Sequence, residues 1–161
     1  MKHPVRRKDR EITDRREIEE ILEKGVFGVL AMCGEDGPYA VPMNYVYSRG
    51  SVWFHCALSG LKLDILRQNP RGSFSVVLNT DYAMPDDPSR PCGWGMFYES
   101  VAVRGPVVFV DSPDEKERIL AELIEKTAGA KFEGKFTPED LARVAVFRLE
   151  AEEMTGKARR P

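Results

Sequence analysis

The stretch Val26–Cys56 reads VFGVLAMCGEDGPYAVPMNYVYSRGSVWFHC. In it, the turn sequences GEDG and SRG separate three apolar runs, residues 26–33, 38–47 and 52–56. Short turns rich in Gly and Asp join antiparallel strands, whereas parallel strands need a crossover of roughly a dozen residues or more. Two hairpins in series therefore predict antiparallel β structure.

The rest of the chain adds helices and further strands to these hairpins. Capping residues and the spacing of apolar residues predict helices at 14–25, from about 59 to 69, from 112 to about 128, and after Thr137. Further strands are expected at 73–78, 98–110 (with a bend at Gly105-Pro106) and 144–154, and a long loop at 79–95. About six strands with three or four peripheral helices predict a mainly β fold, a six-stranded antiparallel split β-barrel, because closure removes exposed sheet edges.

The composition is that of an ordinary globular domain. The 161 residues suit one hydrophobic core, so a single domain over 1–161 is expected, with a flexible arm at 1–9. A net charge of -2 gives no basic field for nucleic acid, and no apolar run reaches the roughly 20 residues that span a membrane. Cys33, Cys56 and Cys92 have neither zinc spacing nor an even count, which predicts free thiols and no metal site. No apolar run follows the basic residues 2–16, so no signal peptide is expected and the protein is expected in the cytoplasm.

The motifs of several enzyme classes are absent from the sequence. Neither G-x-G-x-x-G nor G-x-x-x-x-G-K-[ST] occurs, so a Rossmann or P-loop nucleotide site is not supported. No G-x-S-x-G is present, and His3 and His55 are the only histidines. A histidine-dependent hydrolase is therefore disfavoured.

Two residues interrupt the apolar character of the strand 38–47. Pro42 lacks a backbone donor, which fits either an edge strand or a ladder that is interrupted because a ligand occupies that side. Asn44 either points inward toward a ligand or faces water through simple alternation. The residues alone leave both alternatives open.

The segment Ser59-Gly60-Leu61-Lys62 opens a helix directly after a strand. Free amides at a helix N-terminus, a glycine that permits close approach and a lysine in the first turn can cradle a phosphate. The same pattern also occurs in helices whose lysine is merely solvated. His55, between Phe54 and Cys56, is either a hydrogen-bonded histidine at a strand end or a functional group.

Taken together, several segments resemble the FMN-binding split-barrel family related to pyridoxamine 5'-phosphate oxidase, and within it the nitroimidazole-resistance branch. The resemblance extends over nearly all of the chain from Asp9 onward. The segments that carry it are VPMNY at 41–45, FHCA at 54–57, GLKLD at 60–64, NP at 69–70, YESV at 98–101, Gly105 and TGK at 155–157.

The resemblance implies a flavin site with named positions. Val41, Pro42, Met43 and Asn44 correspond to the strand whose backbone edges the isoalloxazine ring. Phe54 and His55 correspond to the strand beside the flavin and its ribityl chain, and Lys62 to the lysine that binds the 5'-phosphate. Ser100 and Lys157 correspond to further flavin contacts, and His55 is the expected catalytic residue.

Two departures argue against pyridoxamine phosphate as the substrate. Leu61 stands where the oxidase has a basic residue, and Thr155-Gly156-Lys157 replaces its Arg- and His-rich substrate motif. The resemblance therefore implies an FMN-dependent, nitroreductase-like oxidoreductase that passes electrons from a transient donor to a small planar acceptor, nitroimidazole-like or quinone-like. The alternatives are a non-catalytic haem- or flavin-binding split barrel, with His55 as an axial ligand of a haem, and a deazaflavin-dependent reductase.

The expected partner is a second copy of the chain. A barrel of this size is filled by its own side chains, so a flavin must lie outside it and needs a second subunit to cover its other face. The family likewise implies a site at a twofold dimer interface. The loop 79–95, with Trp94 and Phe97 at its end, is the segment expected to reach across.

Overall fold

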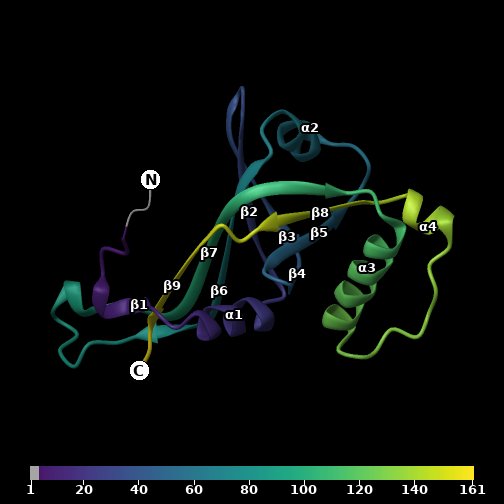
Figure 1. Cartoon of the computed structure of the whole chain (residues 1–161). Helices are drawn as coiled ribbons and strands as arrows, with labels where there is room; N and C mark the ends of the chain where they lie inside the picture. The colour runs from purple at the N-terminus through teal and green to yellow at the C-terminus, as the bar shows by residue number, and fades with distance from the viewer. Residues whose placement is uncertain (1–3) are drawn as a thin grey trace.

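The computed structural model describes residues 4–161 and shows a curved antiparallel sheet with helices at its margins (Figure 1). The strands are β1 (Glu11–Ile12), β2 (Phe27–Gly34), β3 (Gly37–Asn44), β4 (Val46–Ser48), β5 (Ser51–Cys56), β6 (Arg71–Ala83), β7 (Gly95–Val110), β8 (Ala145–Glu150) and β9 (Glu153–Arg159). The helices are α1 (Arg15–Lys24), α2 (Leu61–Gln68), α3 (Pro113–Ala128) and α4 (Pro138–Ala142), with single 3-10 turns η1 (Lys8–Arg10) and η2 (Pro91–Gly93).

The strands follow the order β3-β2-β6-β7-β8-β5-β4, and β9 pairs with both β1 and β7. Every pairing is antiparallel, which confirms the mainly β split-barrel class. Strand β7 joins the two halves of the sheet, because residues 98–104 pair with β9 and residues 107–110 pair with β8. The change of partner falls at Gly105, where a Cβ atom would overlap the carbonyl oxygen of Glu150.

The strand count of about six was too low, because three segments divide or extend differently from the prediction. The expected strand 38–47 ends at Asn44 and resumes as β4, and the expected strand 144–154 breaks at residues 151–152 into β8 and β9. The pair Glu11–Ile12 forms the short strand β1, within a segment that had no predicted strand. Of the expected arm 1–9, residues 1–3 lie outside the described part of the chain.

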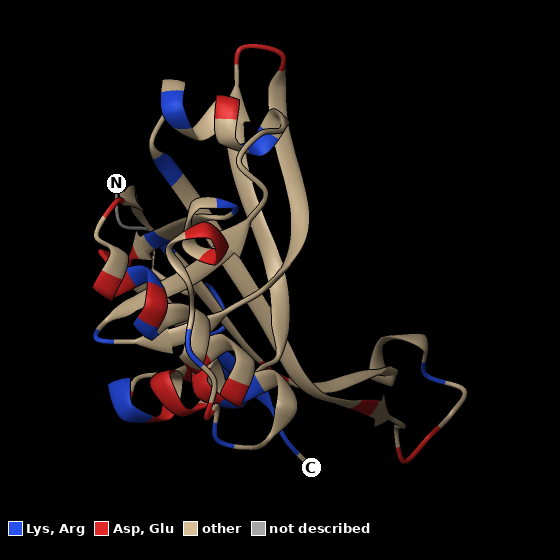
Figure 2. Ribbon diagram, turned by 90° about the vertical axis from the view of Figure 1, so that its right-hand side faces the viewer, with Lys and Arg blue, Asp and Glu red and all other residues tan. Residues whose placement is uncertain are grey.

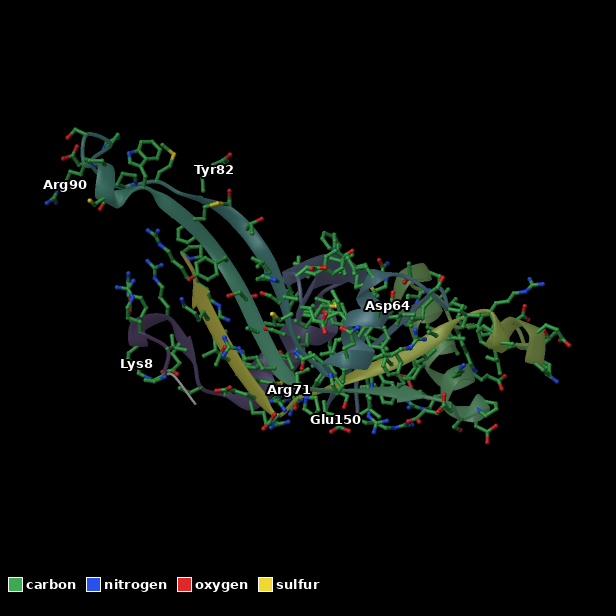
Figure 3. All side chains as sticks on the ribbon, turned by 90° about the horizontal axis from the view of Figure 1, so that it is seen from above. Lys8, Asp64, Arg71, Tyr82, Arg90 and Glu150 are labelled. Carbon is green, nitrogen blue, oxygen red and sulfur yellow. The ribbon has the colours of Figure 1, made fainter. Side chains whose placement is uncertain are left out.

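The predicted loop 79–95 was too long, because only residues 84–94 lie outside the strands. Strand β6 continues to Ala83 and β7 begins at Gly95, so the two strands form a long hairpin, with a register shift between Leu78 and Asp81. The hairpin extends away from the body of the molecule, and Tyr82 and Arg90 lie far from Asp64 of α2 (Figure 3). Polar residues such as Asn79 and Asp81 continue these strands beyond the core, so the apolar alternation that marks a strand is missing there.

The core lies between the two halves of the sheet. Phe54 packs against Phe74 and Phe147, with ring centroids 5.2 Å apart in both cases. Helix α1 closes one side of this core with its buried residues Ile18, Ile21 and Leu22. A second, smaller cluster joins α3 to β5 and β8.

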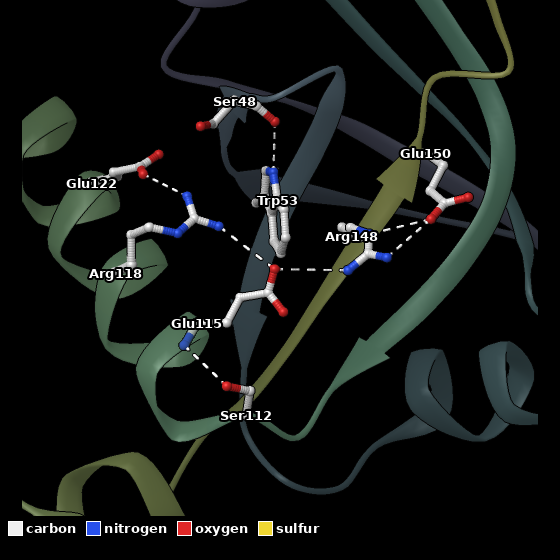
Figure 4. A network of polar contacts seen from close by, with 8 residues as sticks. All are labelled: Ser48, Trp53, Ser112, Glu115, Arg118, Glu122, Arg148 and Glu150. Carbon is white, nitrogen blue, oxygen red and sulfur yellow. Dashed lines mark hydrogen bonds and ion pairs between the residues drawn. The ribbon is translucent and has the colours of Figure 1, made fainter.

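A polar network fixes α3 on the sheet (Figure 4). The indole of Trp53 lies between the guanidinium groups of Arg118 and Arg148, whose Cζ atoms are 5.2 and 5.3 Å from the ring centroid. Glu115 contacts both guanidinium groups, at 3.6 Å from Arg118 Nη2 and 3.9 Å from Arg148 Nη1. Because α3 carries one wall of the site described below, this network helps to set the shape of that site.

The charged residues lie mainly on helices, loops and the hairpin tip, and the sheet strands carry few (Figure 2). No helix within residues 4–161 is long and apolar enough to cross a membrane. In the same range, no group of three or more His, Cys, Asp or Glu side chains is placed to hold a metal ion, and the three cysteines are free thiols.

Candidate functional site

Helix α2 begins with features that suit an anion. Gly60 occupies the N-cap position with φ 134°, a conformation that only glycine adopts readily, and no side chain caps this terminus. The N–H groups of Leu63 and Asp64 already donate to the Gly60 carbonyl, at 2.9 and 3.2 Å. The N–H groups of Leu61 and Lys62 are the first two of the helix, and no carbonyl within the helix is placed to accept their hydrogen bonds.

Lys62 connects this helix to strand β3. Its Nζ atom lies 3.5 Å from the Sδ atom of Met43. The Lys62 charge also reaches His55: burial lowers the pKa of the His55 imidazole, and the nearby lysine lowers it further. His55 is therefore mainly uncharged at neutral pH, with one nitrogen able to donate a hydrogen bond and the other to accept one.

His55 and Asn44 line one cavity of about 490 Å³. Its other walls come from α3, from the segment that follows it and from α4: Leu120, Leu123, Ile124, Thr127, Ala128, Phe136, Asp140 and Val144. Residues from β3, β5 and the two helices therefore meet at one place. Asn44 lies on the outward, solvent-facing side of β3. The cavity lies on that same side, so the two alternatives for Asn44, facing water and facing a ligand, describe one orientation.

Strand β3 lies at one end of the main path of the sheet and, among residues 4–161, pairs only with β2. Pro42 is consequently on an edge strand, and the other backbone edge of Val41–Asn44 is free of strand pairing. The side chains of Val41 and Met43 turn toward the core, so any contact they make with a flavin at this edge is through the backbone.

Ser100 and Lys157 form a second group of predicted site residues. Within one chain, this group lies apart from the group that contains Asn44. Ser100 pairs with Lys157 across β7 and β9, and its hydroxyl donates to the Lys157 carbonyl at 3.3 Å. Strands β2 and β6 lie between β3 and β7, which separates Asn44 from Ser100 by roughly 14 Å along the sheet at about 4.8 Å per strand. The predicted positions therefore fall into two sets on one chain.

The Phe54 ring is fully buried in the core, between Phe74 and Phe147. A flavin beside this strand would therefore meet the backbone of Phe54 and not its ring. Four consecutive residues of β5 are buried, so inward and outward positions did not alternate in a way that the sequence could reveal. Trp94 lies on the distant hairpin, where its Nε1 donates to the Pro88 carbonyl at 3.1 Å.

Sequence reasoning missed two features of this region. The helical residues of the cavity, such as Ile124 and Asp140, are far from Asn44 in sequence and belong to no motif. The second feature is an exposed apolar face on β2 and β6, formed by Phe27 (66% exposed), Val29 and Val77 (54% exposed). Phe27 pairs directly with Asn44, so this outer face is continuous with the edge of the site.

Comparison with known proteins identifies the family. The family model of pyridoxamine 5'-phosphate oxidase matches residues 14–158. The chain belongs to the pyridoxamine 5'-phosphate oxidase family. The resemblance drawn from VPMNY, FHCA and GLKLD is thereby confirmed.

Individual proteins are similar to this chain in sequence or in fold. An uncharacterized protein of Rhizobium meliloti (strain 1021) is 28% identical over 153 residues, 91% of this chain and 93% of the relative. A Bacteroides thetaiotaomicron protein, provisionally assigned to 5-nitroimidazole antibiotic resistance, is 25% identical with a TM-score of 0.79, covering 91% of this chain and 85% of that one. The FAD and haem binding protein of Mycobacterium smegmatis has a TM-score of 0.81 at 16% identity, over 94% of this chain and 74% of its own length.

Proposed function

We propose that the protein is an FMN-dependent oxidoreductase that works as a homodimer and reduces a small planar acceptor, nitroimidazole-like or quinone-like. The observation that carries this proposal is the convergence of Met43, Asn44, His55 and Lys62 from three elements. The family, and the similarity to a protein provisionally assigned to nitroimidazole resistance, support the same function.

The start of α2 fits the 5'-phosphate of FMN. Lys62 supplies an ammonium group, the first two amides of the helix supply donors, and Gly60 lets the backbone approach an oxygen closely. A phosphate at this position gains charge-assisted hydrogen bonds that riboflavin cannot make. The free edge of β3, at Val41–Asn44, offers backbone groups to the polar rim of the flavin ring.

FMN, when bound, supplies the redox chemistry, and the protein supplies orientation and electrostatics. His55 and Asn44 present hydrogen-bonding groups at the mouth of the apolar cavity, where an acceptor can lie beside the flavin. An uncharged His55 orients an acceptor by donating a hydrogen bond rather than by transferring a proton. The electron donor docks transiently, because the sequence has no nicotinamide-binding motif.

The division of the site supports a dimer. Asn44 and Lys62 on one side, and Ser100 and Lys157 on the other, would surround one flavin if the second set came from another copy of the chain. The exposed apolar residues Phe27, Val29 and Val77 lie between the two sets and would be covered by that copy. The long β6–β7 hairpin, with the loop at its tip, is the segment that we expect to reach across.

Titration of the protein with FMN, riboflavin and FAD tests the cofactor directly. FMN should bind more tightly than riboflavin, which lacks the phosphate, and more tightly than FAD, which needs room for an adenylate. Equal affinities for FMN and riboflavin would contradict a phosphate site at Lys62. Mass spectrometry of cofactor released from purified protein distinguishes FMN from a deazaflavin.

A second candidate is a haem-binding protein without turnover. The observation in its favour is that an uncharged imidazole, able to ligate iron, lies at the edge of an apolar cavity. A structural relative from Mycobacterium smegmatis is described as binding FAD and haem. The absorption spectrum of purified protein decides: an intense Soret band favours haem, and two flavin bands in the violet and blue favour FMN.

A further inference from the structure

The β6–β7 hairpin has one covered face and one exposed face. Beyond the register shift, Ala83 pairs with Gly95 and is 1% exposed, and a Cβ atom on Gly95 would overlap the guanidinium group of Arg159. Tyr82 pairs with Met96 on the opposite face, because successive residues of a strand point to opposite sides. Their exposed fractions are 77% and 45%. The hairpin therefore turns two large side chains to solvent on this face.

Exposed apolar side chains continue to the tip of the hairpin, where Met84 is 67% exposed and Trp94 is 49% exposed. The exposed strip, which we call the hairpin face, consists of Tyr82, Met84, Trp94 and Met96. The hairpin leaves the body of the molecule (Figure 3), and a two-stranded hairpin alone is marginally stable in water. Soluble monomers rarely expose a large contiguous apolar patch, so the hairpin face indicates a surface that another molecule covers.

The cavity beside His55 is an apolar hollow that is open to solvent. Leu120 and Leu123 form a buried part of its wall. Most of the other lining residues are exposed: Asn44, His55, Ile124, Thr127, Ala128 and Asp140. The hairpin and helices α3 and α4 lie at opposite ends of the molecule (Figure 1), so the hairpin cannot cover the cavity of its own chain.

Four outward-facing residues form one row across the sheet. Phe27 pairs with Asn44, and Val77 pairs with Ser100. The register between β2 and β6 places Phe27 opposite Val77. The row therefore runs from Asn44 on the edge strand β3 to Ser100 on β7.

The chain leaves both ends of this row in the same direction along the strands. At Ser100, β7 and its neighbour β6 extend into the hairpin. At Asn44, the chain continues to Tyr45, whose ring centre lies 4.0 Å from Lys126 Nζ on α3. A twofold axis parallel to the strands exchanges the two ends of the row and keeps this direction. The hairpin of one copy then passes beyond Asn44 of the other copy, toward α3.

We propose that the hairpin face of a second copy covers the open side of the cavity beside His55, so that this site is complete only in the dimer. The proposal rests on the proposed function, because a flavin shared between Asn44 of one copy and Ser100 of the other requires the ends of the row to be exchanged. An interface of standard size buries about 800 Å² on each partner, more than the side chains of Phe27 and Val77 supply alone. The hairpin face and the exposed lining of the cavity add area at the two ends of the interface.

Crosslinking of two thiols tests this contact. Cys92 is exposed at the hairpin tip, and Ile124→Cys adds a thiol at an exposed position of the cavity wall. Because the two positions lie at opposite ends of one chain, a bismaleimide can join them only between two copies. FMN-loaded protein is treated with bismaleimides of increasing length, and the joined peptides are identified by mass spectrometry. We expect covalent dimers joined between positions 92 and 124, and loss of this link when Cys92→Ser is added.

The chain also supplies a control and a second measurement. Cys33 is exposed at the other end of β2, away from the row, and should not be joined to Cys92. The fluorescence emission of Trp94 should shift to shorter wavelengths as dilute protein associates, and Trp94→Phe should abolish the shift. Trp53, the other tryptophan, is 2% exposed and should not contribute.

The possible outcomes separate this proposal from the proposed function. A protein that is dimeric and holds FMN, but shows no link between positions 92 and 124 or no shift of the Trp94 emission, would overturn the proposal and leave the proposed function standing. A protein that stays monomeric or binds no FMN would contradict the proposed function and, with it, this proposal.

Discussion

The ammonium group of Lys62 lies 3.5 Å from the Met43 sulfur atom, so the first turn of α2 is joined to the end of the edge strand β3. Met43 is a weak acceptor and does not neutralise the lysine charge. A cation is therefore held beside the unpaired amides of a helix N-terminus and next to a free strand edge. This relationship underlies the predictions about the cofactor.

Lys62→Ala should weaken FMN binding by roughly 10- to 100-fold, because a charge-assisted hydrogen bond to phosphate contributes about 1.5–3 kcal/mol. The affinity for riboflavin should change little. Fluorescence titration measures both constants. Lys24→Ala, on the exposed side of α1, is the control and should leave FMN affinity unaltered. If Lys62→Ala binds FMN as tightly as wild type, Lys62 is a solvated surface residue.

Gly60→Ala should lower both stability and FMN affinity. At φ 134° a side chain is strained by about 1–3 kcal/mol, although a Cβ atom there would meet no neighbour. The helix start must then shift and move its amides. Gly37→Ala is the matched control, since Gly37 has φ 110° and equally open surroundings but lies in the β2–β3 turn. It should lower the unfolding free energy alone; a similar loss of FMN affinity there would remove Gly60 from the site.

Phe27→Glu should dissociate the proposed dimer and weaken FMN binding together. A carboxylate at this exposed apolar position would be buried without a partner against a second copy. Sedimentation velocity gives the oligomeric state, and FMN titration gives the affinity. Ala130→Glu adds the same charge after α3, away from this face, and should leave the dimer intact. A dimeric Phe27→Glu protein would place the interface elsewhere.

Lys126 predicts a pH dependence of stability. Its Nζ atom lies 4.0 Å from the centre of the Tyr45 ring and donates to the Leu22 carbonyl, and partial burial lowers its pKa to about 8. Between this pKa and the ordinary value of 10.5, the unfolded chain holds a proton that the folded chain has lost. The unfolding free energy contributed at this position should therefore rise with pH in that window, by less than about 1.4 kcal/mol per pH unit.

Urea denaturation of wild type and Lys126→Met checks this sign. The difference between the two unfolding free energies should shift in favour of the wild type from about pH 8 to 10. Buried Tyr45 and half-buried Tyr47, whose pKa values are also raised, occur in both proteins, so their own titration largely cancels in the difference. A difference that stays flat, or moves against the wild type, would contradict the environment assigned to Lys126.

The secondary structure could be predicted from the sequence where turn and capping residues agree with the burial of the neighbouring apolar residues. The β2–β3 turn at residues 34–37, the Asp14 cap of α1 and the Thr137–Asp140 capping box were all visible as residue patterns, and all are present. The strands of the hairpin beyond residue 78 were not predicted, because they leave the core and lose their apolar alternation. The break between β8 and β9 at residues 151–152 was not predicted, because no Gly or Pro marks it.

Only part of the candidate site could be predicted from the sequence, for a related reason. Motif positions such as Asn44, His55 and Lys62 lie within 19 residues of one another, and a local pattern carried them. Asp140 and Ile124 join them only through tertiary packing of α3 and α4, which leaves no periodic trace in the sequence. The direction of the Phe54 side chain could not be assigned from the sequence, because four consecutive residues of β5 are buried and the alternation of inward and outward positions is lost.

Native mass spectrometry of the protein reconstituted with FMN is the sharpest test of a flavin site shared by two chains, because it gives the number of chains, the cofactor and their ratio in one measurement. We predict a species of two chains, each of 18.2 kDa, with two FMN molecules bound. A dimer interface of this kind should bury more than about 2,000 Å² and survive transfer intact. An FMN-loaded monomer, or a dimer that retains no FMN, would contradict a flavin site shared between two copies of the chain.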